Sequence, residues 1–313
     1  MSRAQAIPHR LIHRFWPMPG HDVVAGLLPR RKMNAEQRRN SRYRQAPPET
    51  LGRLGTLEVR FARTAAEIRK AQQVRYRVFY QERSALADMA TRLARRDVDA
   101  FDAVCDHLLV IDHGMRTRTG ALPVVATYRL LQQQAAEEAS GFYTAGEFDI
   151  DALTRRHPHL RFLELGRSCV LAPYRNKRTL ELLWHGIWAY VRQQGFDVMI
   201  GCASLDGTDP ARLALPLSFL HHYARAPEAW RAQAHAHRRV EMNLMPKDAF
   251  DPKEALRALP PLIKGYLRLG ASIGDGAVID HQFGTTDVLI VLPVSAINAR
   301  YIEHFSIVAQ QAA

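Results

Sequence analysis

The chain has 313 residues, with 43 Lys or Arg against 31 Asp or Glu, so its formal charge is +12. Because 47% of it is hydrophobic and its Gly and Pro content is ordinary, a disordered or collagen-like chain is excluded. No apolar run approaches the roughly 20 residues that a membrane-spanning helix needs. Its three cysteines are too few for a disulfide scaffold, which favours a reducing cytosol.

Residues 1–52 are predicted to form a basic arm and linker. They hold ten Lys or Arg and three Asp or Glu, so most of the net charge lies there. Leu11, Ile12, Phe15 and Trp16 are interleaved with the basic residues, without the continuous apolar core of a signal peptide. This mixture is typical of a segment that binds an anionic membrane surface, of one that binds nucleic acid, and of a solvated terminus.

The body of the chain alternates strand and helix patterns. Strands are predicted at 57–62, 107–112, 124–131, 161–171, 197–205 and 286–293. Helices are predicted from Thr64, with Glu67 completing a capping box, to about residue 82, and from about 180 to Gly195. Further helices are expected from Asp209 onward and over 295–305, and small helices within 132–161. A loop or short helix is expected over 83–101, and a turn at 271–277. The pattern predicts an α/β or α+β sandwich.

Charged residues inside apolar segments mark the candidate site. Glu164 and Arg167 interrupt one strand, Arg129 interrupts another, and Arg75 shares an apolar helix face. Buried charges need partners or a ligand, so a structural network and a substrate site are both open. No nucleotide-binding glycine motif, nucleophile elbow or metal-ligand spacing is present, and the histidines and cysteines are interpreted as surface or core residues.

Four short motifs follow one another in order: RYRVF at 75–79, DVDAFD at 97–102, TYRLL at 127–131 and ELGRSCV at 164–170. The series resembles the acyl-homoserine-lactone synthases, which share the GNAT-type N-acyltransferase fold. The resemblance marks Arg75, Phe79, Asp99, Asp102, Arg129, Glu164 and Arg167 as site residues. Residues 261–305 resemble the hemolysin-like branch of that superfamily, and within it the L-ornithine Nα-acyltransferases of ornithine-lipid synthesis.

This resemblance implies one GNAT domain over 53–306, with a mixed central sheet flanked by helices, a C-terminal extension and a tail at 307–313. It implies transfer of a 3-hydroxy fatty acyl group from acyl carrier protein to the α-amine of L-ornithine, giving lyso-ornithine lipid. The carrier's 4'-phosphopantetheine thioester is then a co-substrate, and no other cofactor and no metal is expected. The basic arm is expected to hold the enzyme on the inner membrane from the cytoplasm, and no nucleic-acid partner is expected.

The chemistry of amine acylation suggests a role for each marked residue. A protonated amine must lose a proton before it attacks a thioester, and Glu164 is the predicted base. Arg75 and Arg129 are predicted to clamp the acceptor's carboxylate, while Asp99 and Asp102 either hold its ammonium group or pair with those arginines. Backbone N–H groups on the strand around Ser168 and Val170 are expected to stabilise the oxyanion. The turn APYRNKRT at 172–179 has no glycine, so Arg175, Lys177 and Arg178 are predicted to face an acidic carrier protein.

Three alternatives remain open on the sequence. The same scaffold could acylate lysine, glutamine, glycine or another amine, or could make an acyl-homoserine lactone. A non-catalytic protein that binds nucleic acid through the basic arm belongs to a different class, and no helix-turn-helix, RRM or zinc-finger signature supports it. A membrane-lytic hemolysin is disfavoured because no secretion signal or spanning segment is found.

Overall fold

One continuous nine-stranded sheet organises the protein in the computed structural model, which describes residues 50–83, 85–298 and 301. The strand order is β1-β2-β3-β4-β5-β6-β9-β8-β7. The strands are β1 (Gly52–Leu54), β2 (Leu57–Phe61), β3 (Asp106–Asp112), β4 (Val124–Gln132), β5 (Phe162–Val170), β6 (Val198–Asp206), β7 (Arg239–Val240), β8 (Ser272–Asp280) and β9 (Thr285–Pro293). All neighbours are antiparallel except β5 and β6, so the sheet is mixed, as the sequence predicts.

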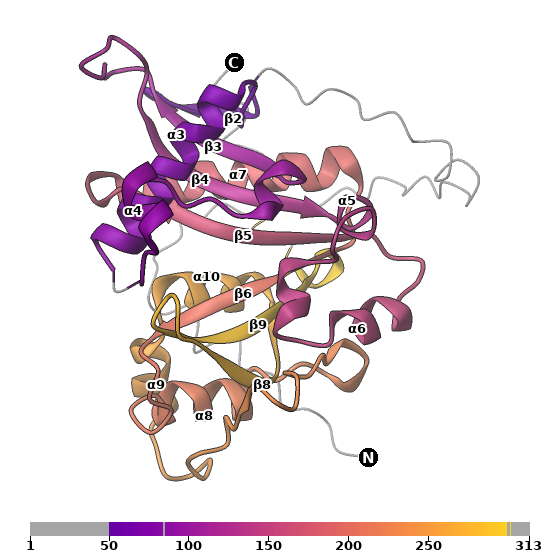
Figure 1. The fold of residues 1–313 in the computed structure, drawn as a ribbon. Helices are drawn as coiled ribbons and strands as arrows, with labels where there is room; N and C mark the ends of the chain where they lie inside the picture. Colours follow the sequence, from indigo (N-terminus) through magenta and orange to yellow (C-terminus); the bar gives the residue numbers. More distant parts are fainter. Residues whose placement is uncertain (1–49, 84, 299–300, 302–313) are drawn as a thin grey trace, which may run out of the picture.

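The parallel pair β5 and β6 divides the sheet into two halves. The two strands pair only from Phe162 to Glu164, against Val198 to Ile200, although each has nine residues. Their remaining lengths diverge, and Figure 1 shows β2–β5 in the upper half and β6, β9 and β8 in the lower half. The divergence leaves the second half of β5 without a partner strand on one side. On that side the backbone of β5 is not paired with β6 beyond Glu164.

A bulge in β5 lies where the two strands diverge. The register of β5 against β4 shifts between the pairs Thr127–Cys169 and Arg129–Gly166. Within the bulge Arg167 has a positive φ of 52°, a conformation that a side chain with a Cβ rarely adopts. Bulges of this kind bend a strand and redirect a side chain, and they are common next to active sites.

Helices cover both faces of the sheet because its strands are apolar on both sides. Leu108 and Val110 of β3 join one core with helix α7 (Lys177–Gln194) and α10 (Pro261–Leu269), whereas Leu109 and Ile111 pack with α3 (Ala65–Tyr76). In Figure 1, α7 lies behind the upper strands and α3 in front of them. Each face therefore buries alternate residues of the same strands.

The segment between β4 and β5 forms a second layer on the front face. It contains α5 (Gln133–Glu137), the 3-10 turn η4 (Tyr143–Gly146) and α6 (Ile150–Arg156), in agreement with the small helices predicted there. The other helices are the π-helical turn η2 (Arg77–Gln81), α4 (Met89–Ala94), η3 (Ala100–Ala103), η5 (Ala172–Tyr174), α8 (Ala214–Tyr223), η6 (Glu228–Trp230), α9 (Pro252–Ala258) and η7 (Val294–Ala296). None of the helices in the described ranges has the length and apolar character needed to cross a bilayer.

Three sequence predictions differ from the structure. Residues 271–277 do not make a turn, because Ser272 begins strand β8 and the glycines lie at a register shift within it. The helix expected from Asp209 begins at Ala214, after turns at 210–213. At the first helix, Thr64 accepts a hydrogen bond from the Glu67 N–H, but Glu67 accepts from the N–H of Arg63 rather than completing the capping box.

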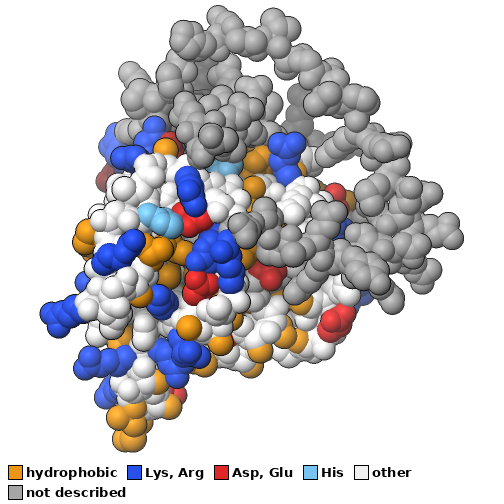
Figure 2. Space-filling view, turned by 90° about the horizontal axis from the view of Figure 1, so that it is seen from above, with side chains coloured by type: hydrophobic (Ala, Val, Ile, Leu, Met, Phe, Trp, Pro, Cys, Tyr) orange, Lys and Arg blue, Asp and Glu red, His pale blue; other side chains and the backbone are white. Residues whose placement is uncertain are grey.

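Two predicted segments lie wholly or partly outside the described residues. These are the basic arm within 1–52, of which only 50–52 are described, and most of the late helix at 295–305 together with the tail. The face seen in Figure 2 carries many more Lys and Arg than Asp and Glu side chains, so the body also presents a basic surface.

Candidate active site

A buried network of three arginines and three aspartates lies on the front face of the sheet. Arg75 of α3, fully buried, donates from Nε to Asp97 over 2.7 Å and from a terminal nitrogen to Asp102 over 2.8 Å. Burial by itself would raise the pKa of Asp102, but the hydrogen bond and charge of Arg75 outweigh it and lower that pKa to about 2. Both groups are therefore charged at neutral pH.

Arg129 of β4 and Arg167 of the β5 bulge complete the network. Arg129 lies 2.5 Å from Asp99 and 3.3 Å from Asp102, and Arg167 lies 3.2 Å from Asp99. Asp99 and Asp102 do pair with the arginines, which was one of the two predicted arrangements. The predicted clamp of Arg75 and Arg129 on an acceptor carboxylate stays a prediction.

Aromatic rings surround the Arg167 guanidinium where β5 and β6 diverge. Its carbon lies 4.8 Å from the ring centres of Tyr143 and Phe283 and 6.0 Å from that of Phe79. Phe79 in turn packs edge-on against Phe283, so η2 contacts the turn between β8 and β9. The resemblance marked Phe79 as a site residue, and the structure places it beside Arg167. These contacts bridge the two halves of the sheet on the front face.

Glu164 is buried and is held by the η4 turn. Its two carboxylate oxygens accept from the backbone N–H of Tyr143 at 2.9 Å and of Thr144 at 2.6 Å, and from the Thr144 hydroxyl. Burial raises the pKa of Glu164 even though these hydrogen bonds oppose the rise. The raised pKa agrees with the environment expected for the predicted base. The contacts show in addition that Glu164 positions Tyr143 and Thr144.

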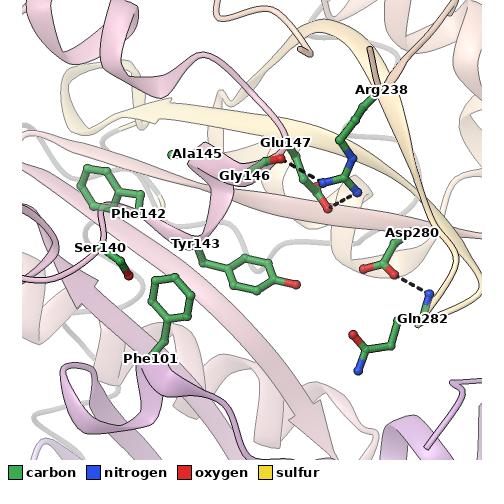
Figure 3. Close-up of a pocket in the computed structure, with 10 residues that line it drawn as sticks. All are labelled: Phe101, Ser140, Phe142, Tyr143, Ala145, Gly146, Glu147, Arg238, Asp280 and Gln282. Atoms are coloured by element: carbon green, nitrogen blue, oxygen red, sulfur yellow. Dashed lines mark hydrogen bonds and ion pairs between the residues drawn. The ribbon is translucent and has the colours of Figure 1, made fainter. Parts of the chain in front are cut away.

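A cavity of about 530 Å³ opens beside this turn. Its walls are Phe101 of η3, residues 140, 142–143 and 145–147, Arg238 before β7, and Asp280 and Gln282 at the β8–β9 turn (Figure 3). This volume lies within the roughly 300–1,000 Å³ that small-molecule sites occupy. Figure 3 shows the Tyr143 hydroxyl pointing across the cavity toward Asp280, with Glu147 and Arg238 along the adjoining wall.

Glu147 brings a second buried carboxylate to the site, and sequence reasoning did not identify it. It accepts a hydrogen bond from the Cys202 thiol at 3.2 Å and lies 3.5 Å from the Arg238 guanidinium. Burial, followed by the nearby charge of Asp287, raises the pKa of Glu147 to about 7. Burial likewise raises the pKa of Asp287. Glu147, Cys202 and Asp287 also offer three possible metal-ligand atoms within 4.8 Å of one another, a cluster that their sequence spacing does not reveal.

The residues predicted to meet the acyl donor lie toward the end of β5 and the start of α7. The N–H of Leu171 donates to Val125 of β4, so by strand alternation the N–H of Val170 points to the side where β5 has no partner. Ser168 is half-buried in the same stretch and hydrogen-bonds to Tyr128. This is the region that the sequence proposed for oxyanion stabilisation.

The basic residues after β5 are exposed and partly paired. Arg175 contacts Glu82 and donates to the carbonyl of Val170 over 2.9 Å, and Lys177 lies 3.4 Å from Glu181. Arg178 is also exposed. Asn176 caps α7 by accepting from the N–H of Thr179. The structure thus places all three predicted cations at one end of α7.

The cysteines and histidines have structural contacts. Burial raises the pKa of the Cys169 and Cys202 thiols, and raises that of Cys105 to about 12, so all three are protonated at neutral pH. His235 contacts the Ala145 carbonyl at 2.8 Å, which anchors the segment before β7 against η4. This agrees with the interpretation of these residues as core or surface groups.

Comparisons with known proteins define the class. The family model described as an acetyltransferase (GNAT) domain matches residues 74–185, which include α3, the strands β3–β5 and the start of α7. Together with the mixed sheet and its divergent parallel pair, this match shows a GNAT-type acyltransferase, as the sequence predicts. An N-acyl amino acid synthase from uncultured soil microbes aligns with a TM-score of 0.43 and 8% identity, covering 76% of this chain and 91% of that chain.

Close relatives define the family more narrowly. The L-ornithine Nα-acyltransferase of Brucella abortus (strain 2308) is 54% identical over 261 residues, covering 82% of this chain and 90% of the relative. The enzyme of the same name from Rhizobium meliloti (strain 1021) is 53% identical, covering 82% of this chain and 86% of the relative. The chain belongs to the L-ornithine Nα-acyltransferase family, which confirms the family assigned from the sequence motifs.

Proposed function

We propose that this protein transfers a 3-hydroxy fatty acyl group from acyl carrier protein to the α-amine of L-ornithine, giving lyso-ornithine lipid. The observation that carries the proposal is the identity of 53–54% to relatives named L-ornithine Nα-acyltransferase, over more than four-fifths of the chain. At this identity the fold is shared, so the acceptor named for the relatives is the first acceptor to test here.

The basic end of α7 supports acyl carrier protein as the donor. Arg175, Lys177 and Arg178 follow the open side of β5, so a thioester that enters along Val170 brings its carrier past them. An acidic carrier is attracted by such a surface, and this attraction weakens with salt. The turn before α7 has no glycine to bring its backbone against a pyrophosphate, which favours a carrier-bound pantetheine over coenzyme A.

A carboxylate base completes the proposed mechanism. The ornithine α-ammonium loses a proton, the amine attacks the thioester carbon, and the carrier's sulfur leaves. Glu164 is the base that the sequence nominates, and its raised pKa supports that role. Backbone N–H groups on the open side of β5 would meet the developing oxyanion.

The proposal also covers location. An acylated amino acid belongs in a bilayer, so an enzyme held on the cytoplasmic face of the inner membrane releases its product where it is used. The ten basic residues of the arm, interleaved with Phe15 and Trp16, support association with anionic lipid. The arm lies outside the described residues, so this part rests on sequence alone.

Expression in a bacterial host that lacks ornithine lipids tests the proposed function. Lipid extracts are analysed by mass spectrometry, and a species with the mass of a 3-hydroxyacyl ornithine is expected. The Glu164→Gln variant is expected to lose about 100-fold or more of the activity while remaining folded. The matched control Glu138→Gln changes an exposed carboxylate in the segment between β4 and β5 and should retain the activity. A different acylated amine in the extract would replace ornithine as the acceptor.

A further inference from the structure

The cavity beside η4 carries charges of both signs. Arg238 donates to the carbonyl of Gly146 over 2.9 Å and lies 3.5 Å from Glu147, and its side chain is one-third exposed. Asp280 lies on the facing wall, where one of its oxygens accepts from the N–H groups of Gln282 and Phe283. A zwitterion with a second cationic group matches this arrangement, because it presents one carboxylate and two ammonium groups.

Negative charge exceeds positive charge around Glu147. Glu147 and Asp287 are both more than nine-tenths buried, Asp280 lies nearby, and Arg238 is the cation in contact with Glu147. Two buried carboxylates that lie close together disfavour the ionisation of both. A cationic ligand at this wall would relieve the repulsion between the carboxylates, and the excess negative charge would favour its binding.

The arginine and aspartate network is less suited to binding the acceptor's carboxylate. Arg75 has no exposed surface and is bound by Asp97 and Asp102, while Arg129 is bound by Asp99 and Asp102. Arg75 and Arg129 have almost no exposed surface, so a substrate carboxylate would have to open this network to reach either of them. Arg238 is accessible from the cavity, so an acceptor can reach it without breaking a buried network.

We propose that this cavity binds the acceptor as a diamino acid, with its carboxylate on Arg238, its α-amine on Glu147 and its side-chain ammonium on Asp280. The inference rests on the proposed function for the reaction, but it assigns residues that the sequence motifs did not. Glu147 contacts the reacting amine and receives one proton from the α-ammonium. The neutral amine then forms the N–C bond, the C–S bond breaks, and the second proton leaves with the sulfur.

The cavity lies on the correct side of the sheet for this reaction. Tyr143 belongs to its wall and also packs on Arg167 in the β5 bulge, so the cavity adjoins the open edge of β5. Glu164 holds Tyr143 and Thr144 through their N–H groups and thereby shapes the same wall. In this arrangement Glu147 takes the place of Glu164 as the base, and Glu164 acts on the reaction by positioning η4.

Asp280→Asn is the first variant to test, because asparagine retains an oxygen for the turn hydrogen bonds and loses the charge. Acceptors are ornithine and norvaline, which is ornithine without the side-chain amine. With acyl carrier protein thioester as donor, we expect kcat/KM for ornithine to fall about 10- to 100-fold and that for norvaline to remain unchanged. Glu147→Gln should lower both, and Glu138→Gln, on the same segment but outside the cavity, should lower neither.

Binding without donor separates this inference from the proposed function. Calorimetry should detect ornithine binding to the full-length protein and at least tenfold weaker binding to Asp280→Asn and Arg238→Gln, with melting temperatures confirming folded variants. If ornithine is acylated but Asp280→Asn lowers kcat/KM equally for ornithine and for norvaline, the cavity assignment is wrong and the reaction stands. If ornithine binds as expected but is not acylated, the reaction is wrong and the cavity stands. Loss of activity in EDTA would overturn the cavity assignment, since Glu147, Cys202 and Asp287 would then serve a metal ion.

Discussion

Arg75 illustrates how a fully buried cation depends on its partners. Replacing it with methionine keeps an unbranched side chain but removes the guanidinium that donates to Asp97 and Asp102, which retain only Arg167 and Arg129 at 3.3 Å. We expect Arg75→Met to lower the free energy of unfolding by about 3–5 kcal/mol, because two buried aspartates lose the cation closest to them. Urea unfolding followed by circular dichroism measures this.

An exposed ion pair provides the matched control for Arg75. Arg83 lies 3.0 Å from Asp206, but both side chains are more than half exposed. Arg83→Met should change the free energy of unfolding by only about 0–1 kcal/mol. Equal effects of the two substitutions would show that the network around Arg75 contributes no more than a surface pair.

The same network predicts how the stability of the fold changes at low pH. In the folded protein the pKa of Asp102 is about 2, compared with its ordinary value of 3.8. A lowered pKa stabilises the fold above pH 4, and this stabilisation is lost as the pH falls toward 2. The difference corresponds to about 2 kcal/mol at neutral pH.

Comparison with Asp102→Asn isolates this contribution. Wild type should be more stable than the variant at pH 6, and the difference in unfolding free energy should shrink steadily between pH 4 and pH 2.5. Urea titrations at these pH values measure it. A difference that does not change with pH would mean that Asp102 stabilises the fold through hydrogen bonds that the asparagine retains.

The site could be predicted from sequence where a charge interrupts an apolar pattern. Arg75, Arg129, Glu164 and Arg167 all stand out in this way, and all four are buried or nearly so. Glu147 does not stand out, because it lies in a polar insertion without periodicity. Its environment comes from β6, β9 and the segment before β7, so only the folded chain reveals its raised pKa.

At the scale of elements, the divergence of β5 and β6 depends on a close approach between them. A Cβ built on Gly201 of β6 would lie 2.3 Å from the carbonyl oxygen of Leu165 in β5, a contact that backbone atoms cannot relieve without moving. Gly201→Ala is therefore expected to lower the unfolding free energy by about 1–3 kcal/mol, the usual effect of overpacking. It should also reduce acyl transfer, because the opening between the strands shifts.

Gly166, in the bulge of β5, is the control for that substitution. No atom lies within 4 Å of a Cβ built there, and its φ is not in the left-handed region. Gly166→Ala should leave the melting temperature within about 2 °C of wild type. If both alanine variants have the melting temperature of the wild type, the close approach at Gly201 does not constrain the two strands.

Strands and helices were predictable where their periodicity is regular. The pattern of α7 and its end at Gly195 agree with the structure, since an apolar stripe and a left-handed glycine are local signals. The prediction of a turn at 271–277 is wrong, because Gly274 and Gly276 suggest a turn although they lie within β8. In the sheet they lie at a register shift, where the Ala232 carbonyl approaches Gly274 and Gly276 has a positive φ of 86°.

At the scale of the whole molecule, positive charge is concentrated in residues 1–52, which hold a net charge of +7 out of +12. We expect the full chain to co-sediment with vesicles that contain about a third anionic lipid. Each basic residue near such a surface contributes roughly 1 kcal/mol, so binding should weaken strongly between 0.05 and about 0.5 M salt. A chain that begins at residue 46 should lose most of this binding and retain acyl transfer to ornithine in detergent solution.

The body of the protein offers a rival surface that this experiment can identify. Leu86, Met89, Leu93 and Val98 are all more than half exposed, and Arg92 and Arg95 lie among them. Insertion of such apolar side chains is less sensitive to salt than attraction between charges, because it depends on buried area. If the shortened chain still binds vesicles and resists salt, this segment around α4 rather than the arm holds the enzyme on the membrane. Met89→Asp in the shortened chain should then release it.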